Sequence, residues 1–307
     1  MSEDLNRSGD GRADRRSDYA ASYAEAGDLT AAADLMRQAL ELRPLWIAGW
    51  TLLGGYRERG GDTASAIDAY RRALSLDPAD GQGAALKLAS LGVAAVPTSA
   101  PPAFVKGLFD QYADRFETSL VAELGYAGPD LLMTDILRLT GPSRRFVHAL
   151  DLGCGTGLMG ERLRPFADRL TGVDLSPAMI EKARRKAIYD RLDVGDILDA
   201  EAGDLAPDLV TAADVLIYVG DLGPVASRVA ALVAPSGLFA FTVERHDGDA
   251  PFVVGPSLRY RHSRAGAIAP AEAAGFALKS EAPLVLRQDR GEPVEGLAFV
   301  FERTGPG

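Results

Sequence analysis

The sequence predicts an α/β domain with a mainly parallel sheet, preceded by an all-α domain of short helical repeats. Residues in the first third recur at a fixed offset, which is typical of stacked helix pairs. After residue 104, short β-rich runs alternate with helical stretches, and this alternation favours a parallel sheet covered by helices. Residues 284–303 have the pattern of a terminal antiparallel hairpin.

The composition is that of an ordinary globular protein. The chain has 307 residues, of which 47% are hydrophobic and 25% charged. Its formal net charge of -10, without clustered Lys and Arg, disfavours nucleic acid as a partner. No apolar run approaches the roughly 20 residues of a membrane-spanning helix. The start lacks the apolar core of a secretory signal, and the lone Cys154 suits a reducing cytoplasm.

The helical repeats have a period of 34 residues. Seven identities share this offset: Gly27 with Gly61, Asp28 with Asp62, Ala32 with Ala66, Ala39 with Ala73, Leu40 with Leu74, Leu42 with Leu76 and Pro44 with Pro78. The second copy resembles a tetratricopeptide repeat, with Trp50, Leu53, Gly54, Gly61, Ala66, Tyr70, Ala73 and Pro78 at signature positions. Arg57 departs from that pattern, and Arg16 replaces the large apolar residue of the first copy. The resemblance implies a domain that interacts with a protein or a substrate.

The pattern predicts four segments along the chain. We expect a solvated, disordered tail over residues 1–17 and helical repeats over 18–96, capped by a helix near 82–91. The prolines of VPTSAPPAF favour extended backbone and predict a linker over 97–104. The α/β domain then covers 105–307.

A glycine-rich loop follows the first predicted strand, Phe146–Asp151. It reads Gly153-Cys154-Gly155-Thr156-Gly157, and the next strand ends in Asp174. In an open α/β sheet, ligands bind at the carboxyl ends of the strands, where glycines let the backbone approach a ligand. An acid at the position of Asp174 suits hydrogen bonds from ribose hydroxyls.

Two cofactors compete for this loop. Gly155-x-Gly157-x-x-Gly160 matches a dinucleotide fingerprint and would indicate a nicotinamide cofactor. Asp151, two residues ahead of the first glycine, favours a cofactor with an ammonium and a sulfonium instead of a pyrophosphate. The motif D-x-G-x-G-x-G resembles the first motif of class I methyltransferases that use S-adenosylmethionine (SAM), whose fold is a Rossmann-like sheet with a terminal antiparallel hairpin.

Further segments extend this resemblance over residues 17–303. Residues 109–132 resemble a helical lid ahead of the sheet. Together with RYRHS and LRQDRGEPVEG, they make the chain similar to a bacterial group described as predicted methyltransferases containing tetratricopeptide repeats. The resemblance implies methyl transfer from SAM to an unidentified acceptor, either a small molecule or a protein.

The resemblance also implies roles for single residues at the cofactor. Gly153, Gly155 and Gly157 would form the cofactor loop, and Asp151 would face the methionine part of SAM. Asp174 with the adjoining Leu175 would hold the ribose, and Asp196 with Ile197 would contact adenine. The predicted contacts are completed by Asp214, near the cofactor amine or the acceptor, and by Tyr112, at the cofactor carboxylate.

Methyl transfer needs mainly the positioning of two reactants, plus a base if the acceptor is neutral. His262 is the candidate general base, and Tyr218 is the candidate acceptor contact. Arg259 and Arg261 alternate along one strand, so at most one faces the pocket, where it could bind a carboxylate. His148 is expected to be a satisfied core residue. No metal-ligand spacing and no GxSxG elbow occur in the sequence.

Two other functions stay open at this point. The short repeats and the missing obvious base allow an adaptor protein with a degenerate, non-catalytic methyltransferase domain. The run GTGLMG allows a NAD(P)-dependent oxidoreductase. The sequence also leaves open the oligomeric state, and whether the repeat groove binds a partner or packs on the second domain.

Overall fold

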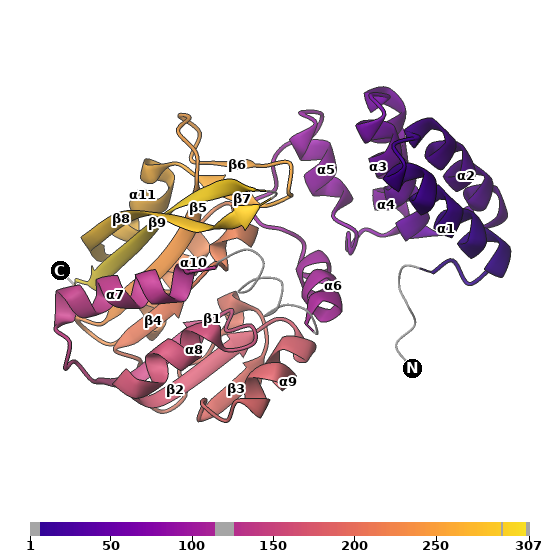
Figure 1. Ribbon diagram of the computed structural model, residues 1–307. Helices are drawn as coiled ribbons and strands as arrows, with labels where there is room; N and C mark the ends of the chain where they lie inside the picture. Colours follow the sequence, from indigo (N-terminus) through magenta and orange to yellow (C-terminus); the bar gives the residue numbers. More distant parts are fainter. Residues whose placement is uncertain (1–6, 114–125, 290, 305–307) are drawn as a thin grey trace. The chain divides into compact units, whose positions relative to one another are not determined.

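The computed structural model describes residues 7–113, 126–289 and 291–304, and it divides into two compact units. The first unit is Met1–Pro97 and the second is Thr98–Gly307 (Figure 1). The division falls within the proline-rich VPTSAPPAF stretch. Within the described residues, no helix has both the length and the apolar character needed to cross a membrane.

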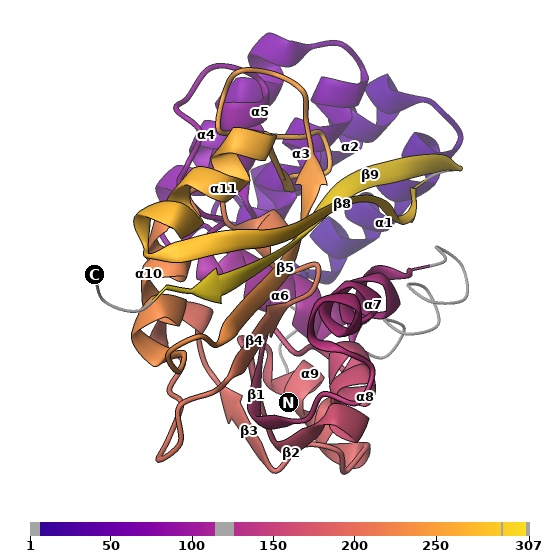
Figure 2. The same ribbon diagram turned by 90° about the vertical axis from the view of Figure 1, so that its left-hand side faces the viewer.

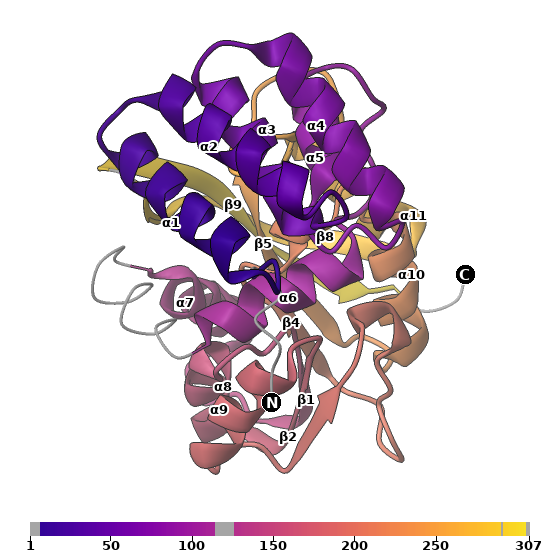
Figure 3. The same cartoon turned by 90° about the vertical axis from the view of Figure 1, so that its right-hand side faces the viewer.

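The first unit is a stack of helices in which each helix packs against the next (Figure 3). Its elements are α1 (Gly11–Glu25), α2 (Leu29–Leu42), α3 (Ile47–Arg59), α4 (Thr63–Leu76) and α5 (Ala84–Ser90). The two copies of the repeat have the same kind of turn between their helices. Gly27 and Gly61 both have positive φ, at 87° and 84°. Asp28 and Asp62 then cap the following helices by accepting hydrogen bonds from the backbone N–H groups three residues on.

The start of the chain corrects the expected tail. Residues 11–17 belong to α1, because Asp10 caps this helix by accepting from the backbone N–H groups of Arg12 and Ala13. Ala13 is fully buried in the same apolar cluster as Ala32 and Met36 of α2. The part of the predicted tail at residues 1–6 lies outside the described residues.

The predicted linker is also corrected from residue 98 onward. Ser99 forms an antiparallel bridge with Val219, and the Ala100 N–H donates to the Tyr218 carbonyl at 2.8 Å. Helix α6 (Pro102–Tyr112) begins within the proline-rich stretch, because proline fits the first turn of a helix, where its missing N–H has no partner to lose. These residues therefore belong to the second unit.

The second unit is a sheet of nine strands covered by helices. Its elements after α6 are α7 (Gly128–Thr140), β1 (Phe146–Leu152), α8 (Leu158–Leu163), β2 (Ala167–Asp174), α9 (Pro177–Arg185), β3 (Arg191–Val194), β4 (Leu209–Ala212), α10 (Gly223–Leu232), β5 (Leu238–Arg245), β6 (Phe252–Val254), β7 (Tyr260–His262), α11 (Arg264–Ala273), β8 (Phe276–Asp289) and β9 (Glu292–Arg303). Helices α7 and α8 lie on one face of the sheet, and α10 and α11 lie on the other (Figure 2).

The strand order places a switch point beside β1. Strands run in the order β3-β2-β1-β4-β5, all parallel, so the chain leaves β1 toward β2 on one side and returns on the other side at β4. Strand β5 then pairs with β7 in parallel and with β9 in antiparallel, and β8 pairs with β9. The predicted parallel sheet with a terminal antiparallel hairpin is therefore confirmed.

Both faces of the sheet are buried, which explains the near-continuous apolar runs of its central strands. In β1, Leu150 and Leu152 belong to the core that contains Phe239 and Phe241, under α10 and α11. Ala149 belongs to the opposite core, under α7 and α8. This double packing fixes the carboxyl ends of β1, β2 and β4, where ligands bind in open α/β sheets.

Candidate active site

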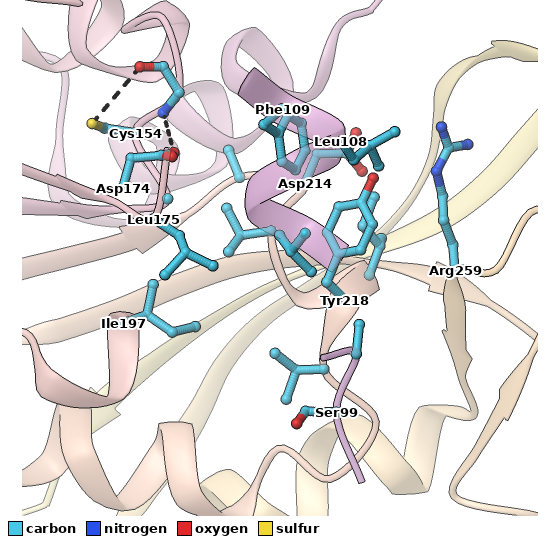
Figure 4. A pocket seen from close by; sticks show the side chains of 18 of the residues that line it. Ser99, Leu108, Phe109, Cys154, Asp174, Leu175, Ile197, Asp214, Tyr218 and Arg259 are labelled. Atoms are coloured by element: carbon cyan, nitrogen blue, oxygen red, sulfur yellow. Dashed lines mark hydrogen bonds between the residues drawn. The ribbon is translucent and has the colours of Figure 1, made fainter. Parts of the chain in front are cut away.

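A cavity of about 670 Å³ lies at the carboxyl ends of β1, β2 and β4, within the second unit. The glycine loop, the end of β2, residues 196–198, residues 213–219 and helix α6 line it (Figure 4). Its volume falls in the range of small-molecule sites. The cavity thus occupies the place where the strand order predicts a ligand.

The glycine loop needs glycine for two different reasons. Gly153, Gly155 and Gly157 all have positive φ, at 62°, 53° and 95°. A Cβ on Gly155 would meet nothing within 4 Å, so the backbone there is open to a ligand. A Cβ on Gly153 would overlap the side chain of Val215. Gly157, which was predicted to contact the cofactor, does not line the cavity, and its backbone instead leaves room for the ring of Tyr189.

Asp174 ties the glycine loop to the end of β2. Its Oδ2 accepts from the Gly155 N–H at 2.9 Å, and its Oδ1 accepts from the Ser176 N–H at 2.8 Å. Burial raises the pKa of the Asp174 carboxyl, although these two N–H groups act in the opposite direction. A carboxylate has about four acceptor sites, so Asp174 can also accept from a ligand in the cavity that it lines.

The segment after β3 forms an apolar wall with one acid. Asp196, Ile197 and Leu175 line the cavity, as predicted for the nucleoside end of a cofactor. The Asp196 Oδ1 accepts from the Leu198 N–H at 2.9 Å and caps the short turn Ile197–Asp199. This arrangement suits a flat ring held between aliphatic side chains, with a carboxylate at its edge.

Asp151 does not reach the cavity, which corrects its predicted contact with the methionine part of SAM. Its side chain is 1% exposed, and both oxygens are bound by hydroxyl groups, from Tyr189 at 2.7 Å and Thr211 at 3.0 Å. Burial raises the pKa of Asp151 to about 7, even though these two hydrogen bonds act in the opposite direction. Asp151 therefore anchors the structure beneath the loop.

Tyr189 is the partner that sequence reasoning missed. Its ring lies where a Cβ on Gly160 or Gly172 would overlap it. Two of the three glycines in the Gly155-x-Gly157-x-x-Gly160 run, Gly157 and Gly160, thus make room for the ring of Tyr189. This packing accounts for the apparent dinucleotide fingerprint without a pyrophosphate.

Asp214 lines the cavity in a strained backbone conformation. Its φ is 57°, which is uncommon for a residue other than glycine. The Asp214 N–H donates to Thr242 Oγ1 at 2.8 Å, and both carboxylate oxygens accept from one terminal nitrogen of Arg287. Arg287 is 1% exposed and also binds Glu244. Arg287 was not predicted, because nothing in the sequence near β4 signals a partner on β8.

Aromatic side chains line the end of the cavity next to α6. The ring of Tyr218 meets Phe109 edge to face, with centroids 5.4 Å apart. Tyr112 lines the cavity with half of its surface exposed, and Tyr126, which was not predicted, lines it too. Burial raises the pKa of Tyr218, and the neighbouring Arg259 guanidinium acts in the opposite direction.

His262 is not brought to the cavity, which corrects its prediction as general base. It is fully buried on β7, and its Nε2 lies 3.0 Å from the carbonyl oxygen of Gly220. Burial lowers the pKa of His262 to about 4. His148 is a satisfied core residue, as expected, with ring nitrogens at 2.7 Å from the Leu205 carbonyl oxygen and 2.9 Å from Thr171 Oγ1.

The predicted lid segment is described in part. Residues 114–125 of the expected 109–132 lie outside the described residues. Of the arginines on β7 and just before it, Arg259 lines the cavity and Arg261 does not, as their alternation predicts. In the parts of the chain that the structure describes, no group of three His, Cys, Asp or Glu residues could hold a metal ion.

Comparison with protein families shows which domains the chain contains. Residues 150–239 match the family described as methyltransferase domain, and residues 47–80 match the tetratricopeptide repeat. The chain carries a class I SAM-dependent methyltransferase domain preceded by a tetratricopeptide repeat. The methyltransferase match includes the glycine loop, Asp174 and Asp214, so it covers part of the cavity lining.

Curated relatives match about a third of the chain. The ubiquinone biosynthesis O-methyltransferase of Coxiella burnetii is 34% identical over 106 residues, which are 32% of this chain and 44% of that protein. Nodulation protein S of Rhizobium tropici is 34% identical over 100 residues, which are 31% of this chain and 42% of that protein. The chain thus spans about half or less of the length of the curated relatives it matches.

Solved structures share the fold of the methyltransferase domain at low sequence identity. The 1,6-didemethyltoxoflavin-N1-methyltransferase of Burkholderia thailandensis aligns with a TM-score of 0.53 at 19% identity, over 68% of this chain and 93% of that chain. The magnesium protoporphyrin IX methyltransferase of Synechocystis aligns with a TM-score of 0.51 at 16% identity, over 66% and 99%. These alignments confirm the predicted fold.

Proposed function

We propose that this protein transfers a methyl group from SAM to an acceptor bound in the cavity beside Tyr218. The observation that carries the proposal is the backbone of Gly155, which is open to the cavity and hydrogen-bonded to the buried Asp174. The match to the methyltransferase domain supports it further. When bound, SAM supplies an electrophilic methyl group on a sulfonium, with a neutral thioether as leaving group.

The residues of the cavity fit this cofactor along its length. Asp174 with Leu175 would hold the ribose, and Asp196 with Ile197 would contact adenine, since all four line the cavity. Gly155 would let the backbone approach the methionine part. Tyr112, on the last turn of α6, would bind the cofactor carboxylate. Asp214, already bound to Arg287, would lie near the cofactor amine or the acceptor.

Tyr218 is assigned to the acceptor as a hydrogen-bond donor. Because burial raises the pKa of its hydroxyl, the group stays protonated at neutral pH and cannot act as a general base there. With His262 buried away from the cavity, neither of the two candidate residues, His262 and Tyr218, supplies a base for the acceptor. The proposal therefore favours an acceptor atom that is ionised, or that loses its proton to solvent.

The tetratricopeptide repeat gives the protein a surface for a protein or peptide partner, since this is the role that the repeat implies. A cytoplasmic location is part of the same proposal, because the single cysteine suits a reducing compartment. A change of partner would alter which acceptor reaches the enzyme, and would leave the chemistry of the cavity unchanged.

Calorimetry with S-adenosylhomocysteine (SAH) and SAM tests the cofactor. We expect the full chain to bind both. Asp174→Ala should weaken binding by roughly 10- to 100-fold, since a hydrogen bond to a charged group is worth about 1.5–3 kcal/mol. Asp168→Ala, at the exposed opposite end of β2, is the matched control and should bind normally. No binding to the full chain at millimolar SAH would overturn the proposal.

Two further measurements distinguish methyl transfer from the non-catalytic adaptor and from the oxidoreductase. Incubation of the protein with radiolabelled SAM in a cell lysate should transfer label to an acceptor. SAH binding without transferred label would favour a non-catalytic adaptor. Enhancement of NADH fluorescence on mixing with the protein, together with no SAH binding, would favour an oxidoreductase.

A further inference from the structure

Resting on the proposed methyl transfer, we propose that the acceptor is a ring-bearing apolar molecule that carries a carboxylate, and that Arg259 binds this carboxylate. The proposal names the chemical class of the second substrate. It depends on two independent features of the cavity. The first is an apolar wall on α6. The second is the guanidinium group of Arg259, to which no carboxylate among the described residues is hydrogen-bonded.

The apolar wall is one face of α6. Phe104, Val105, Leu108 and Phe109 all line the cavity at helical spacing. None of the residues of α6, all of which are described, is buried, so this apolar face meets the cavity rather than a protein core. A half-exposed apolar face that borders a cavity marks a binding site for apolar surface.

The rings of the wall set the shape of what fits against it. Phe109 and Tyr218 meet edge to face, which leaves the two rings as an angular aromatic corner inside the cavity. Aromatic pairs favour offset or edge-to-face contacts, so a flat ring can add to this corner with the same geometry. We infer that the body of the acceptor is a ring system that packs against Phe109 and Tyr218.

Arg259 supplies the charge that complements a carboxylate. It lines the cavity, and its side chain is 27% exposed. Arg259 forms ion pairs with Glu244 and Asp289, but their carboxylate oxygens lie 3.9 Å from its Nη1, beyond hydrogen-bond distance. Its side chain also hydrogen-bonds the Tyr218 hydroxyl, which holds the guanidinium at the cavity. A guanidinium has five N–H donors in a planar fork that matches a carboxylate.

The other arginine of the cavity is already neutralised. Arg287 binds Asp214 and Glu244, so its charge is offset by two carboxylates. Glu244 is 2% exposed and Arg287 is 1% exposed, which holds this pair away from an incoming ligand. Arg259 is therefore the arginine of this wall that keeps donors for a substrate.

The backbone before β7 is built to place Arg259. Leu258 has a φ of 60°, which costs energy in a residue with a side chain. Its N–H donates to the Gly255 carbonyl at 2.9 Å, and the Gly255 N–H donates to the Arg259 carbonyl at 2.8 Å. This tight turn between β6 and β7 fixes the point from which the Arg259 side chain leaves the backbone.

The two ends of the cavity suit two reactants. Figure 4 shows Asp174, Leu175 and Ile197 on one side and Arg259 on the other, with Asp214 and Tyr218 between them. With the nucleoside of SAM at the first end, an acceptor held by Arg259 would direct its other end toward Tyr218 and the methyl group. Arg259 thus acts as the residue that determines acceptor specificity.

Binding of 2-naphthoate and of 2-naphthamide to the SAH-saturated full chain tests this inference, because the two probes share one ring system and differ in charge. We expect naphthoate to bind at least tenfold more tightly than naphthamide to the unaltered protein. Arg259→Gln should abolish this preference while SAH affinity stays unchanged. Arg261→Gln, two residues further on, within β7 and outside the cavity, is the matched control and should keep the preference.

The outcomes distinguish this inference from the proposed function. If SAH fails to bind the unaltered protein, the proposed function is wrong, and this inference falls with it. If SAH binds but naphthoate does not bind, or shows no preference over naphthamide, the inference alone is wrong. The same conclusion follows if Arg259→Gln keeps the preference. Arg259→Lys, which retains the charge without the planar fork, should keep part of the preference.

Discussion

Arg287 donates from one terminal nitrogen to both carboxylate oxygens of Asp214, at 2.7 and 3.0 Å, although 73 residues separate the two. The other terminal nitrogen of Arg287 binds the buried Glu244 on β5, and Asp214 and Arg287 line the cavity. Asp214 holds a strained backbone conformation at this contact, with φ of 57°. The C-terminal hairpin thus fixes the loop after β4, which lies between the end of the cavity at Asp174 and the end at Arg259 (Figure 4).

Replacing Arg287 should destabilise the methyltransferase domain strongly. Arg287→Met would leave the Asp214 carboxylate without its cation, and would leave Glu244 with the longer ion pairs to Arg259 and Arg261 alone, at 3.9 and 3.6 Å; breaking a buried pair costs about 3–5 kcal/mol. The matched control Arg264→Met breaks an exposed pair with Glu281 and should change the stability little. Scanning calorimetry would measure both. Equal shifts in the melting temperature of the domain would contradict a structural role for this contact.

Much of the fold follows from local sequence patterns, and these parts of the fold were predictable. The 34-residue offset arises because each copy repeats a Gly-Asp turn, in which the aspartate caps the next helix. The alternation of strands and helices follows from a sheet buried on both faces. The glycine loop and Asp174 were also predictable, because both depend on short spacings within one strand–loop–helix unit.

The rest of the site depends on contacts that no local pattern encodes. Asp151 was expected in the cavity, but hydroxyl groups of Tyr189 and Thr211, 38 and 60 residues away, hold it beneath the loop. His262 was expected as a base, but β7 pairs inside the sheet and buries it. In both cases the residue type was suited to the chemistry. The position of each residue was decided by strands and helices that are distant in the sequence and pack around it.

The buried Asp151 should make stability fall as pH rises. Its pKa is raised from 3.8 to about 7 in the folded protein, so between these values the folded state holds a proton that the unfolded state has lost. Stability is therefore greatest below about pH 4 for this group, and it is lost as pH rises toward 7, by on the order of 4 kcal/mol. The change should level off above the folded pKa.

Asp151→Asn isolates this effect, because asparagine has nearly the same shape and does not titrate. Relative to the unaltered protein, the variant should gain stability steadily from pH 4 to pH 7. Hydrogen exchange of β1 peptides at several pH values would measure the difference. Asp168→Asn, at an exposed site on β2, should show no such trend. A difference that is constant with pH would show that Asp151 is ionised throughout.

Alanine substitutions at two glycines of positive φ, one in the glycine loop and one at the end of α7, separate an effect on stability from an effect on binding. Gly155→Ala should cost about 1–2 kcal/mol of stability through backbone strain and should weaken SAH binding at least tenfold, because the methyl group enters the open cavity. Gly141→Ala is also strained, because Gly141 has φ of 94° and ψ of 150°, but it lies at an open position outside the cavity and should leave SAH affinity unchanged. Calorimetry and thermal unfolding would measure the two effects. Unchanged SAH binding by Gly155→Ala would rule out close approach of a ligand there.

Two adjacent glycines on α3 offer a matched pair for the repeat unit. A Cβ on Gly54 would lie 2.6 Å from Cε1 of Tyr70, whose ring is fully buried and whose hydroxyl donates to Glu58 at 2.6 Å. The ring cannot move without breaking that bond, so Gly54→Ala should cost about 1–3 kcal/mol. A Cβ on Gly55 meets only the Tyr70 hydroxyl, at 3.9 Å. Gly55→Ala should therefore stabilise the helix by about 0.5–1 kcal/mol.

Both tryptophans of the chain, Trp46 and Trp50, lie in the repeat unit, so tryptophan fluorescence in urea follows the unfolding of this unit alone. The transition midpoint should fall for Gly54→Ala and rise for Gly55→Ala. Shifts of the same sign would mean that the close packing of Tyr70 against α3 does not decide the stability of the repeat. Opposite shifts would show why a glycine at the first of these two positions belongs to the signature of the repeat, whereas the second position tolerates a side chain.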